Sequence, residues 1–240
     1  MNSCFRALPT TSPWRAERNE IGMAVALIVA AGSGERLGAE CPKAFVLLGG
    51  RPMIEWSIEA LQAVPAVTAI VVALPPGAAA PRGTVGVLGG ASRCASVAAA
   101  LAVAPFADEV IVHDAARPLA STQLFVEALE QLKKHACDAV VAAAPLTDTV
   151  KEVGHDGEVR RTLDRSTLWA VQTPQVFRRA ALEAALSGSD DELAAATDDA
   201  SLVEAAGGRV RVVAAPRENL KVTTALDLQV AQLLLAERVV

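Results

Sequence analysis

Short, continuously apolar runs are the feature that most restricts how this chain can fold. The first covers residues 24–30 and reads AVALIVA. A strand without polar alternation suits burial on both faces, as in a parallel sheet that helices cover on each side. Further runs of this kind occupy residues 68–74, 85–88, 109–113, 139–144 and 210–214. Together they predict the strands of one buried sheet.

Helical periodicity separates several of these runs. Apolar residues recur at helical spacing in stripes formed by Ile54, Ile58 and Leu61, by Phe125, Leu129 and Leu132, and by Leu226, Val230 and Leu233. We expect each stripe to face the core. Thr224 with Asp227 is typical of a capped helix start, and Thr197 precedes another acidic first turn. Strands that alternate with helices predict an α/β fold with a doubly wound, mostly parallel sheet.

The length of 240 residues suits one α/β domain with a substantial core. We expect this domain to span residues 23–240. Residues 1–22 mix charges and prolines without periodicity and end where the first strand pattern begins. They are predicted to be a disordered extension or a misassigned start, the alternative being that Phe5 and Trp14 dock on the domain.

The segment 145–177 interrupts the alternation of strands and helices. Short β-like pieces around 149–153 and 159–163 flank the turn-rich sequence GHDG at 154–157. This pattern predicts a hairpin arm that protrudes from the sheet. Such an arm either caps a site or reaches a partner subunit, or does both.

Composition argues against several functions. The formal net charge of −5 disfavours wrapping of nucleic acid, which requires a basic face. No apolar run reaches the roughly 18 residues that span a bilayer, and the opening stretch lacks the layout of a secretory signal. We therefore expect no membrane association and a cytoplasmic location. The 4 cysteines form no Cys-x-x-Cys pair, which predicts neither a zinc site nor a disulfide framework.

The first strand leads directly into a glycine-rich turn, AAGSGERLG at 30–38. Glycine lets backbone N–H groups come close to phosphate oxygens. The glycine spacing matches neither the dinucleotide fingerprint nor a P-loop. Arg36 in the turn and Lys43 shortly after it bring two cations to this phosphate cradle, which suits a triphosphate. The alternative is that both are solvated surface charges.

A second candidate position is Asp114, directly after the run 109–113. In open α/β sheets, ligands bind at the carboxyl ends of the strands. An aspartate there can hold a magnesium ion or a ribose hydroxyl, and Mg²⁺ needs few protein ligands when a triphosphate supplies the others. The neighbouring His113 is interpreted as a structural histidine.

Several motifs carry a resemblance to a known family. They are AAGSGERL at 30–37, Pro42-Lys43, GGASRCASV at 89–97, HDAARP at 113–118, PLTDTVK at 145–151, DRSTLWAVQTPQVF at 164–177, TDDAS at 197–201 and ENLKVT at 218–223. Over nearly all of residues 24–240 the chain resembles the methylerythritol phosphate cytidylyltransferase family of the non-mevalonate isoprenoid pathway. The resemblance implies a Rossmann-like sheet of nucleotidyltransferase type with a protruding β-arm. The chain departs from the family pattern at Ala44, where glutamine is frequent, and in the short proline-rich loop 75–82.

The resemblance also implies roles for individual residues. Arg36 and Lys43 are expected to stabilise charge at the reacting α-phosphate, and Arg165 and Lys221 to position the attacking phosphate. The residues expected to bind CTP are Ala30, Ala31, Gly32, Gly34, Gly89, Gly90, Ser96, Asp114 and Ala115. The residues expected to bind the sugar-alcohol phosphate are Arg117, Thr149, Arg165 and Lys221. Mg²⁺ is expected beside Asp114 and the CTP phosphates, and a homodimer is expected in which the arm brings Thr149 and Arg165 to the partner's site.

The implied reaction transfers CMP from CTP to 2-C-methyl-D-erythritol 4-phosphate, which gives 4-diphosphocytidyl-2-C-methyl-D-erythritol and pyrophosphate. A phosphate monoester is mostly a dianion at neutral pH because its second pKa is about 6, so this nucleophile needs no general base. Two alternatives stay open. One is another sugar or cofactor nucleotidyltransferase, and the other is a dinucleotide-binding oxidoreductase or sensor module, against which the glycine spacing counts.

Overall fold

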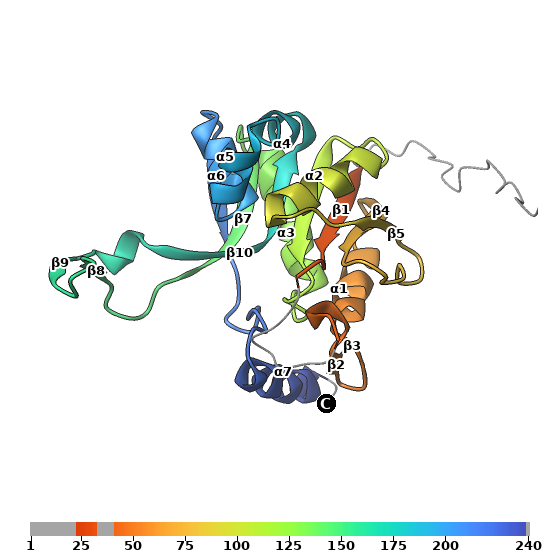
Figure 1. Ribbon diagram of the computed structural model, residues 1–240, viewed down its shortest axis with the longest axis horizontal. Coiled ribbons are helices and arrows are strands. Elements are labelled where there is room, and N and C mark those ends of the chain that lie inside the picture. The colour runs from red at the N-terminus through yellow and green to blue at the C-terminus, as the bar shows by residue number, and fades with distance from the viewer. Residues whose placement is uncertain (1–22, 33–40, 239–240) are drawn as a thin grey trace, which may run out of the picture.

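The computed structural model describes residues 23–32 and 41–238 (Figure 1). The predicted extension 1–22 lies outside the described residues. Gly34 and Arg36 lie outside them as well. A 7-stranded sheet runs through the molecule in the order β11-β7-β10-β6-β1-β4-β5. Its strands are β1 (Ala24–Val29), β4 (Val67–Leu74), β5 (Val85–Leu88), β6 (Glu109–Asp114), β7 (Ala139–Pro145), β10 (Trp169–Arg178) and β11 (Val210–Ala214).

The sheet is parallel except around β10. β1 pairs in parallel with β4 and with β6, and β5 and β11 are parallel to their neighbours. These pairings confirm the predicted fold class and the strands expected from the apolar runs. β10 runs antiparallel between β6 and β7. The sequence pattern assigns most of β10 to the arm at 145–177. The end of the predicted arm at residue 177 is wrong, because Gln175, Val176 and Phe177 are buried in the sheet.

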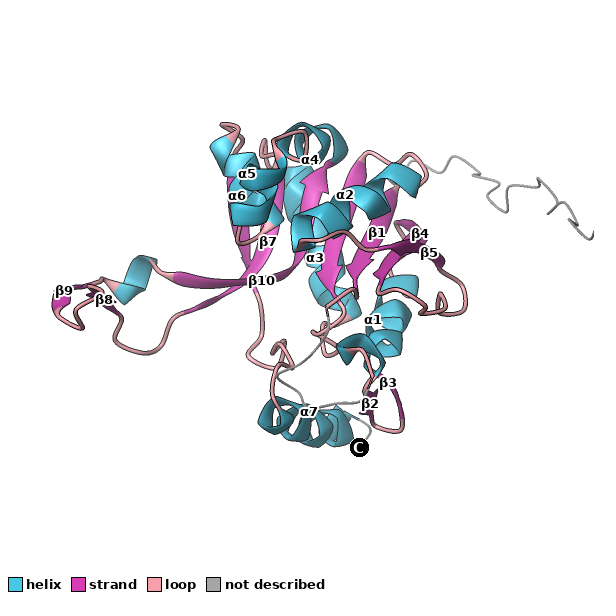
Figure 2. Ribbon diagram, in the orientation of Figure 1, coloured by secondary structure: helices cyan, strands magenta, loops and turns pink. Residues whose placement is uncertain are grey.

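Helices cover both faces of the sheet (Figure 2). They are α1 (Met53–Gln62), α2 (Arg93–Val103), α3 (Thr122–Lys134), α4 (Arg179–Ala185), α5 (Asp190–Ala195), α6 (Asp199–Ala205) and α7 (Ala225–Arg238). Along β1, Ala24, Ala26 and Ile28 face a core shared with α1 and α3. Val25 and Leu27 face the core shared with α2, α4 and α6. Burial on both sides explains why the strand shows no polar alternation.

The predicted stripes of α1 and α3 are buried, whereas that of α7 is not. Leu226, Val230 and Leu233 are 67%, 39% and 68% exposed, so the expectation that they face the core is wrong. α7 instead packs its Ala231 and Leu235 face against a small separate core beside the hairpin of β2 (Leu47–Leu48) and β3 (Arg51–Pro52). Apolar residues occur around most of this helix, so its sequence leaves the buried face undetermined.

The predicted helix starts near Thr224 and Thr197 both carry side-chain caps. At the start of α7, the Asp227 N–H donates to Thr224 Oγ1 at 3.2 Å, and the Thr224 N–H donates to Asp227 Oδ2 at 2.8 Å. At α6 the capping residue is Asp198, whose carboxylate accepts from the Ser201 N–H at 2.9 Å. Each cap satisfies a backbone donor that a helix start leaves without a partner.

The arm consists of β8 (Lys151–Val153) and β9 (Val159–Thr162), which form a separate 2-stranded sheet, followed by the short helix η3 (Arg165–Thr167). It extends far from the body of the molecule (Figure 1). Val153 and Val159 are 52% and 57% exposed. A hairpin therefore forms where the sequence predicts one, and its apolar side chains are not covered within one chain.

No helix in the described part of the chain is both long and apolar enough to cross a membrane.

Candidate active site

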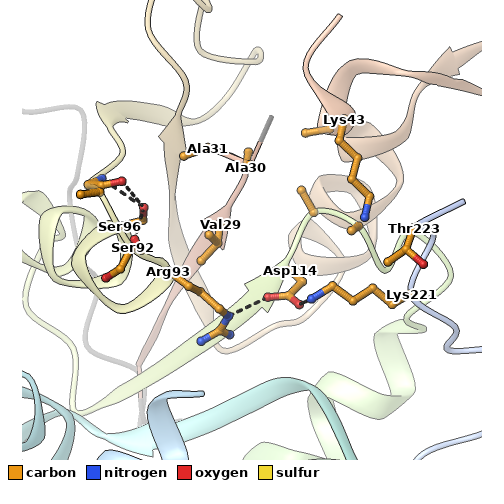
Figure 3. Close-up of a pocket in the computed structure, with 16 residues that line it drawn as sticks. Val29, Ala30, Ala31, Lys43, Ser92, Arg93, Ser96, Asp114, Lys221 and Thr223 are labelled. Carbon is orange, nitrogen blue, oxygen red and sulfur yellow. Dashed lines mark hydrogen bonds and ion pairs between the residues drawn. The ribbon is translucent and has the colours of Figure 1, made fainter. Parts of the chain in front are cut away.

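A cavity of about 570 Å³ lies at the carboxyl ends of β1 and β6, next to the start of α2. It is lined by Val29, Ala30, Ala31, Gly32, Lys43, Ala44, Gly90, Ala91, Ser92, Arg93, Ser96, Asp114, Ala115, Ala116, Lys221 and Thr223 (Figure 3). Its volume falls within the range of small-molecule sites, roughly 300–1,000 Å³. Its position agrees with ligand binding at the carboxyl ends of strands.

The turn between β5 and α2 is shaped for close approach of the backbone. A Cβ atom at Gly90 would lie 2.5 Å from Cβ of Ala95, so no larger residue fits without a shift. Ser96 fastens the turn to α2, because its hydroxyl accepts from the Gly90 N–H at 3.1 Å and donates to the Ser92 carbonyl at 2.9 Å. The protein itself uses both functions of this hydroxyl. Ser96 therefore sets the backbone shape of the cavity wall.

Asp114, the last residue of β6, lies between two cations (Figure 3). Arg93 Nε is 3.1 Å from its Oδ1, and Lys221 Nζ is 2.7 Å from its Oδ2. Burial by itself raises the pKa of this carboxyl, but the charges of Arg93 and Lys221 outweigh burial and hold the pKa well below its usual range. Asp114 is therefore a carboxylate at physiological pH. It holds both cations at the cavity.

A second carboxylate, Asp199 in the first turn of α6, lies behind Arg93. Its side chain is fully buried, and one of its oxygens accepts from Nη1 of Arg93. Burial raises the pKa of Asp199, and the Arg93 charge opposes that rise. The two carboxylates outweigh burial at Arg93 and raise the pKa of its guanidinium further. Arg93 is therefore held as a cation at the cavity wall by two anions.

Of the two cations expected at the α-phosphate, Arg36 and Lys43, the structure describes Lys43. It starts the short helix η2 (Lys43–Phe45), and Pro42 precedes it in extended conformation. Its side chain points toward the region of Asp114 and Thr223, across the cavity from Ser92 and Ser96 (Figure 3). The cavity thus has the glycine-shaped backbone and Arg93 on one side and the cations Lys43 and Lys221 on the other.

Most of the residues expected to bind CTP lie at this cavity. Those that line it are Ala30, Ala31, Gly32, Gly90, Ser96, Asp114 and Ala115. Gly89 lies directly behind the wall, where an added Cβ would be 2.3 Å from Cβ of Ala31. Gly34, together with the expected catalytic Arg36, belongs to the part of the chain that is not described.

The residues expected to bind the acceptor are divided between two places. Lys221 lines the cavity, and Arg117 is buried nearby, where its Nη1 donates to the Asn219 carbonyl at 2.7 Å. Thr149 and Arg165 are exposed at the arm and do not line the cavity of their own chain. Arg165 instead donates through Nη1 to the Thr147 carbonyl. The geometry of one chain therefore brings together Lys43, Asp114 and Lys221, and leaves the arm residues apart.

Sequence reasoning missed Arg93, Asp199 and Thr223 as residues of the site. All three belong to motifs that were recognised, GGASRCASV, TDDAS and ENLKVT, but nothing local assigns them a role. A signal for Arg93 exists in the sequence, because this arginine directly follows the Ser92 helix cap at the end of a glycine turn. A cation at that position faces the carboxyl ends of the neighbouring strands.

Asp114 is also the expected metal ligand. Among the described residues, no group of three or more His, Cys, Asp or Glu side chains could hold a metal ion, and Asp114 is the one carboxylate of the cavity lining. Each of its oxygens already accepts from a cation, which leaves limited capacity for a further ligand. These residues fit an ion such as Mg²⁺ that takes one carboxylate and receives its other ligands from phosphates and water.

The described cavity lining carries the cations Lys43, Arg93 and Lys221 against the single carboxylate of Asp114. This local excess of positive charge contrasts with the net charge of −5 of the whole chain. A doubly wound sheet with a glycine-shaped, cationic cavity at its strand ends defines a nucleotide-binding α/β protein that takes an anionic ligand.

Comparison with known proteins gives the family. The family model described as 2-C-methyl-D-erythritol 4-phosphate cytidylyltransferase matches residues 24–237. The protein of that name from Frankia casuarinae is 48% identical over 218 residues, covering 88% of this chain and 80% of that one. The one from Rhodococcus jostii is 43% identical over 224 residues, covering 90% and 96%. The chain therefore belongs to the 2-C-methyl-D-erythritol 4-phosphate cytidylyltransferase family.

Solved structures of the same family agree with the fold. The crystal structure of 2-C-methyl-D-erythritol 4-phosphate cytidylyltransferase from Francisella tularensis superimposes with a TM-score of 0.76 at 32% identity, covering 88% of this chain and 99% of that one. The one from Thermus thermophilus gives 0.74 at 35% identity, covering 88% and 98%. The α/β sheet described above is thus the fold of that family.

Proposed function

We propose that this chain is a nucleotidyltransferase that transfers CMP from CTP to 2-C-methyl-D-erythritol 4-phosphate. The products are 4-diphosphocytidyl-2-C-methyl-D-erythritol and pyrophosphate, in the non-mevalonate route to isoprenoid precursors. Family membership over residues 24–237 supports the activity. The observation that carries the chemistry is the cationic cavity that Lys43, Arg93 and Lys221 line together with Asp114.

The reaction requires no general base. A phosphate oxygen of the acceptor forms a bond to the α-phosphorus of CTP, and the bond from that phosphorus to the bridging oxygen breaks with release of pyrophosphate. The acceptor is mostly a dianion at neutral pH, because its second pKa is about 6. Asp114 is ion-paired, and His113 is fully buried with both ring nitrogens engaged. Neither is needed for proton transfer.

Catalysis then depends on bringing two anions together. At about 4 Å and an effective dielectric constant of about 20, two unit charges repel by about 4 kcal/mol. We assign Lys43 and Arg36 to charge at the α-phosphate, and Lys221 and Arg117 to the acceptor phosphate. Arg93 and Asp114 keep the cationic side of the cavity in place. Positioning and electrostatic stabilisation supply the rate enhancement.

We also propose that Mg²⁺ enters with CTP. When bound, the ion would neutralise charge on the triphosphate and favour the departure of pyrophosphate. Asp114 is the residue that would approach it, and phosphate oxygens and water would supply its remaining ligands. The protein's own contribution is then a carboxylate that Arg93 and Lys221 hold in a fixed orientation.

The acceptor half of the site is proposed to be shared between two chains of a homodimer. Thr149 and Arg165 stand on the arm, outside the cavity of their own chain. Apolar side chains at the arm and its base are exposed, namely Val153, Val159, Trp169 and Val171. A second subunit that covers them would bury this surface and receive Arg165 at its acceptor phosphate. The charged, water-soluble substrates suit action in the cytoplasm, and the net negative charge disfavours nucleic acid as a partner.

A pyrophosphate-release assay with CTP, UTP, GTP and ATP, each with the methylerythritol phosphate acceptor and Mg²⁺, tests the proposal. We expect activity with CTP well above that with the other nucleotides. A preference for another nucleotide, or no release that depends on the acceptor, would refute the assigned substrates. The same assay separates this enzyme from a nucleotidyltransferase with a different base.

A further inference from the structure

A buried histidine lies directly beside the cavity with both ring nitrogens engaged. His113 precedes Asp114 in β6 and is fully buried. Its Nε2 is 3.2 Å from the carbonyl oxygen of Arg117, and its Nδ1 is 3.1 Å from Oγ1 of Thr173 in β10. The ring also packs edge-on against Phe125, with 5.0 Å between ring centroids.

The direction of the hydrogen bonds determines the tautomer of this ring. The Asp114 N–H can only donate, and it donates to Thr173 Oγ1 at 3.0 Å. The Thr173 hydroxyl has one proton to donate to Nδ1 of His113 and a second lone pair that can accept from a proton on Nδ1, so the other ring nitrogen decides the direction. At the other nitrogen, the Arg117 carbonyl can only accept, so Nε2 carries the ring proton. A ring with this one proton accepts the Thr173 hydroxyl proton at Nδ1.

The ring consequently holds both ends of one turn. Through Thr173 it holds the Asp114 N–H, and directly it holds the Arg117 carbonyl. The turn is closed by a bond from the Arg117 N–H to the Asp114 carbonyl at 2.9 Å. The two side chains at these ends are the carboxylate that pairs with Lys221 and the guanidinium of Arg117.

The segment that carries Lys221 is joined to the same turn. The Asn219 carbonyl accepts from Arg117 Nη1 at 2.7 Å, and Asn219 Nδ2 donates to the Thr173 carbonyl at 2.9 Å. The Val222 N–H donates to the Ala116 carbonyl at 2.8 Å. Asn219 is fully buried, as is His113. Three segments distant in sequence therefore form one hydrogen-bonded unit beneath the acceptor side of the cavity.

We propose that His113 is a positioning residue for the acceptor half of the site. As the Nε2–H tautomer it holds the turn at 114–117, and through that turn it keeps Arg117 and Lys221 in the arrangement that receives the sugar phosphate. It contacts no substrate. Asp114 and Ala115 of this turn also belong to the CTP half, but the rest of that half lies on other elements, since Gly90 and Ser96 belong to the turn before α2 and to α2 itself, and Lys43 belongs to η2. The inference rests on the proposed function, because that function assigns Arg117 and Lys221 to the acceptor.

The test compares His113→Phe with His113→Gln. Phenylalanine keeps the ring and its packing on Phe125 but leaves the Thr173 hydroxyl and the Arg117 carbonyl without their partner. We expect the KM for 2-C-methyl-D-erythritol 4-phosphate to rise by about tenfold or more, as the loss of buried hydrogen bonds predicts. The dissociation constant for CTP, measured by calorimetry, should rise by clearly less than the acceptor KM. His113→Gln, whose amide can still donate to Arg117, should recover part of the loss.

His135→Phe is the matched control. His135 follows α3, and its ring hydrogen-bonds Gln131 Oε1 at 3.1 Å, away from the cavity lining. It should leave both substrate constants unchanged. An unchanged acceptor KM in folded His113→Phe, or an equal loss of affinity for CTP and acceptor, would overturn the inference. A wild-type enzyme inactive with these substrates would instead refute the proposed function.

A second measurement does not depend on activity or on the folding of a variant. Nitrogen-15 NMR of histidine-labelled wild-type protein reports which ring nitrogen of His113 carries the proton. The chain has 3 histidines, so the resonances can be assigned with the His135→Phe sample and a His155 variant. An Nε2–H ring supports the proposed hydrogen-bond chain, and an Nδ1–H ring overturns it.

Discussion

Replacing Arg93 by methionine tests whether the buried carboxylate of Asp199 depends on this cation. Arg93 pairs with Asp199 through Nη1 and with Asp114 through Nε. Asp114 keeps a second cation, because Lys221 lies 2.7 Å from its Oδ2. Asp199 is fully buried, and no other cation is paired with it among the described residues. Arg93→Met keeps an unbranched side chain while it leaves Asp199 without a counter-charge.

The expected loss of stability is large. Removing one partner of a buried ion pair costs about 3–5 kcal/mol, since the remaining charge stays buried. For a domain of this size 1 kcal/mol corresponds to about 2–4 °C, so Tm should fall by about 6–20 °C at neutral pH. The exposed pair of Arg161 and Glu152 provides the control, because Arg161→Met there should change stability by at most about 1 kcal/mol.

The loss should also depend on pH. Burial raises the pKa of Asp199, and Arg93 opposes this rise, so the folded-state pKa climbs further in Arg93→Met. A carboxyl group whose pKa is higher in the folded state than in the unfolded state contributes stability when the pH is below the unfolded-state pKa. This contribution is lost as the pH rises through the folded-state pKa. The deficit of the variant relative to wild type is therefore greatest at neutral pH. It should shrink as the pH falls through the raised folded-state pKa toward the unfolded-state value of about 4, because Asp199 of the folded variant takes up a proton in that range.

Calorimetric melting curves at several pH values check both expectations. The double variant Arg93→Met, Asp199→Leu should regain much of the lost stability, because an apolar replacement of a buried pair is often neutral. A fall in Tm no greater than that of Arg161→Met would refute the reasoning. A deficit that grows as the pH falls would refute it as well.

Four further outcomes are expected. Lys43→Ala should lower turnover by about two orders of magnitude with an unchanged melting curve, as lost charge stabilisation at the α-phosphate predicts, and wild-type turnover would exclude Lys43 from the reaction. Lys221→Ala should raise the KM for the sugar phosphate while calorimetry shows CTP binding largely intact, and equal losses would contradict this division. Mixing inactive Lys43→Ala with inactive Arg165→Ala under subunit exchange should restore about a quarter of all sites, because half of the dimers are mixed and each mixed dimer has one intact site. If the mixture stays inactive after exchange has been verified, Arg165 acts within its own chain. Gly90→Ala should weaken CTP binding about tenfold or more, since the added Cβ would lie 2.5 Å from Cβ of Ala95, and a titration curve equal to wild type would show that the turn adapts.

Local patterns were sufficient to predict most of the sheet. The run at 24–30 is apolar without alternation because β1 is covered on both faces, and the same holds for β4, β6 and β7. The cap at Thr224 is also a local matter, since its partners lie within three residues. The motifs around Lys43, Gly90, Asp114 and Lys221 indicated a nucleotide site, and these residues line one cavity.

Other features depend on contacts between distant residues. The strand β10 follows the arm, and the same segment could belong to either until its pairing with β6 and β7 is known. In α7, apolar residues lie on several faces, and packing against Leu48 and Val222 selects the face with Ala231.

The sequence by itself determined the fold class and the cationic, glycine-rich character of the site, because hydrophobicity, backbone freedom and charge are properties of individual residues and short segments. The family was indicated by the resemblance of the sequence motifs. The tertiary structure alone decided which charges meet. Arg93 and Asp199 are 106 positions apart, and Lys221 reaches Asp114 from the far end of the chain. A buried ion pair forms only where the packed sheet and helices exclude water from both partners. No local sequence pattern shows which residues so far apart in the chain will meet.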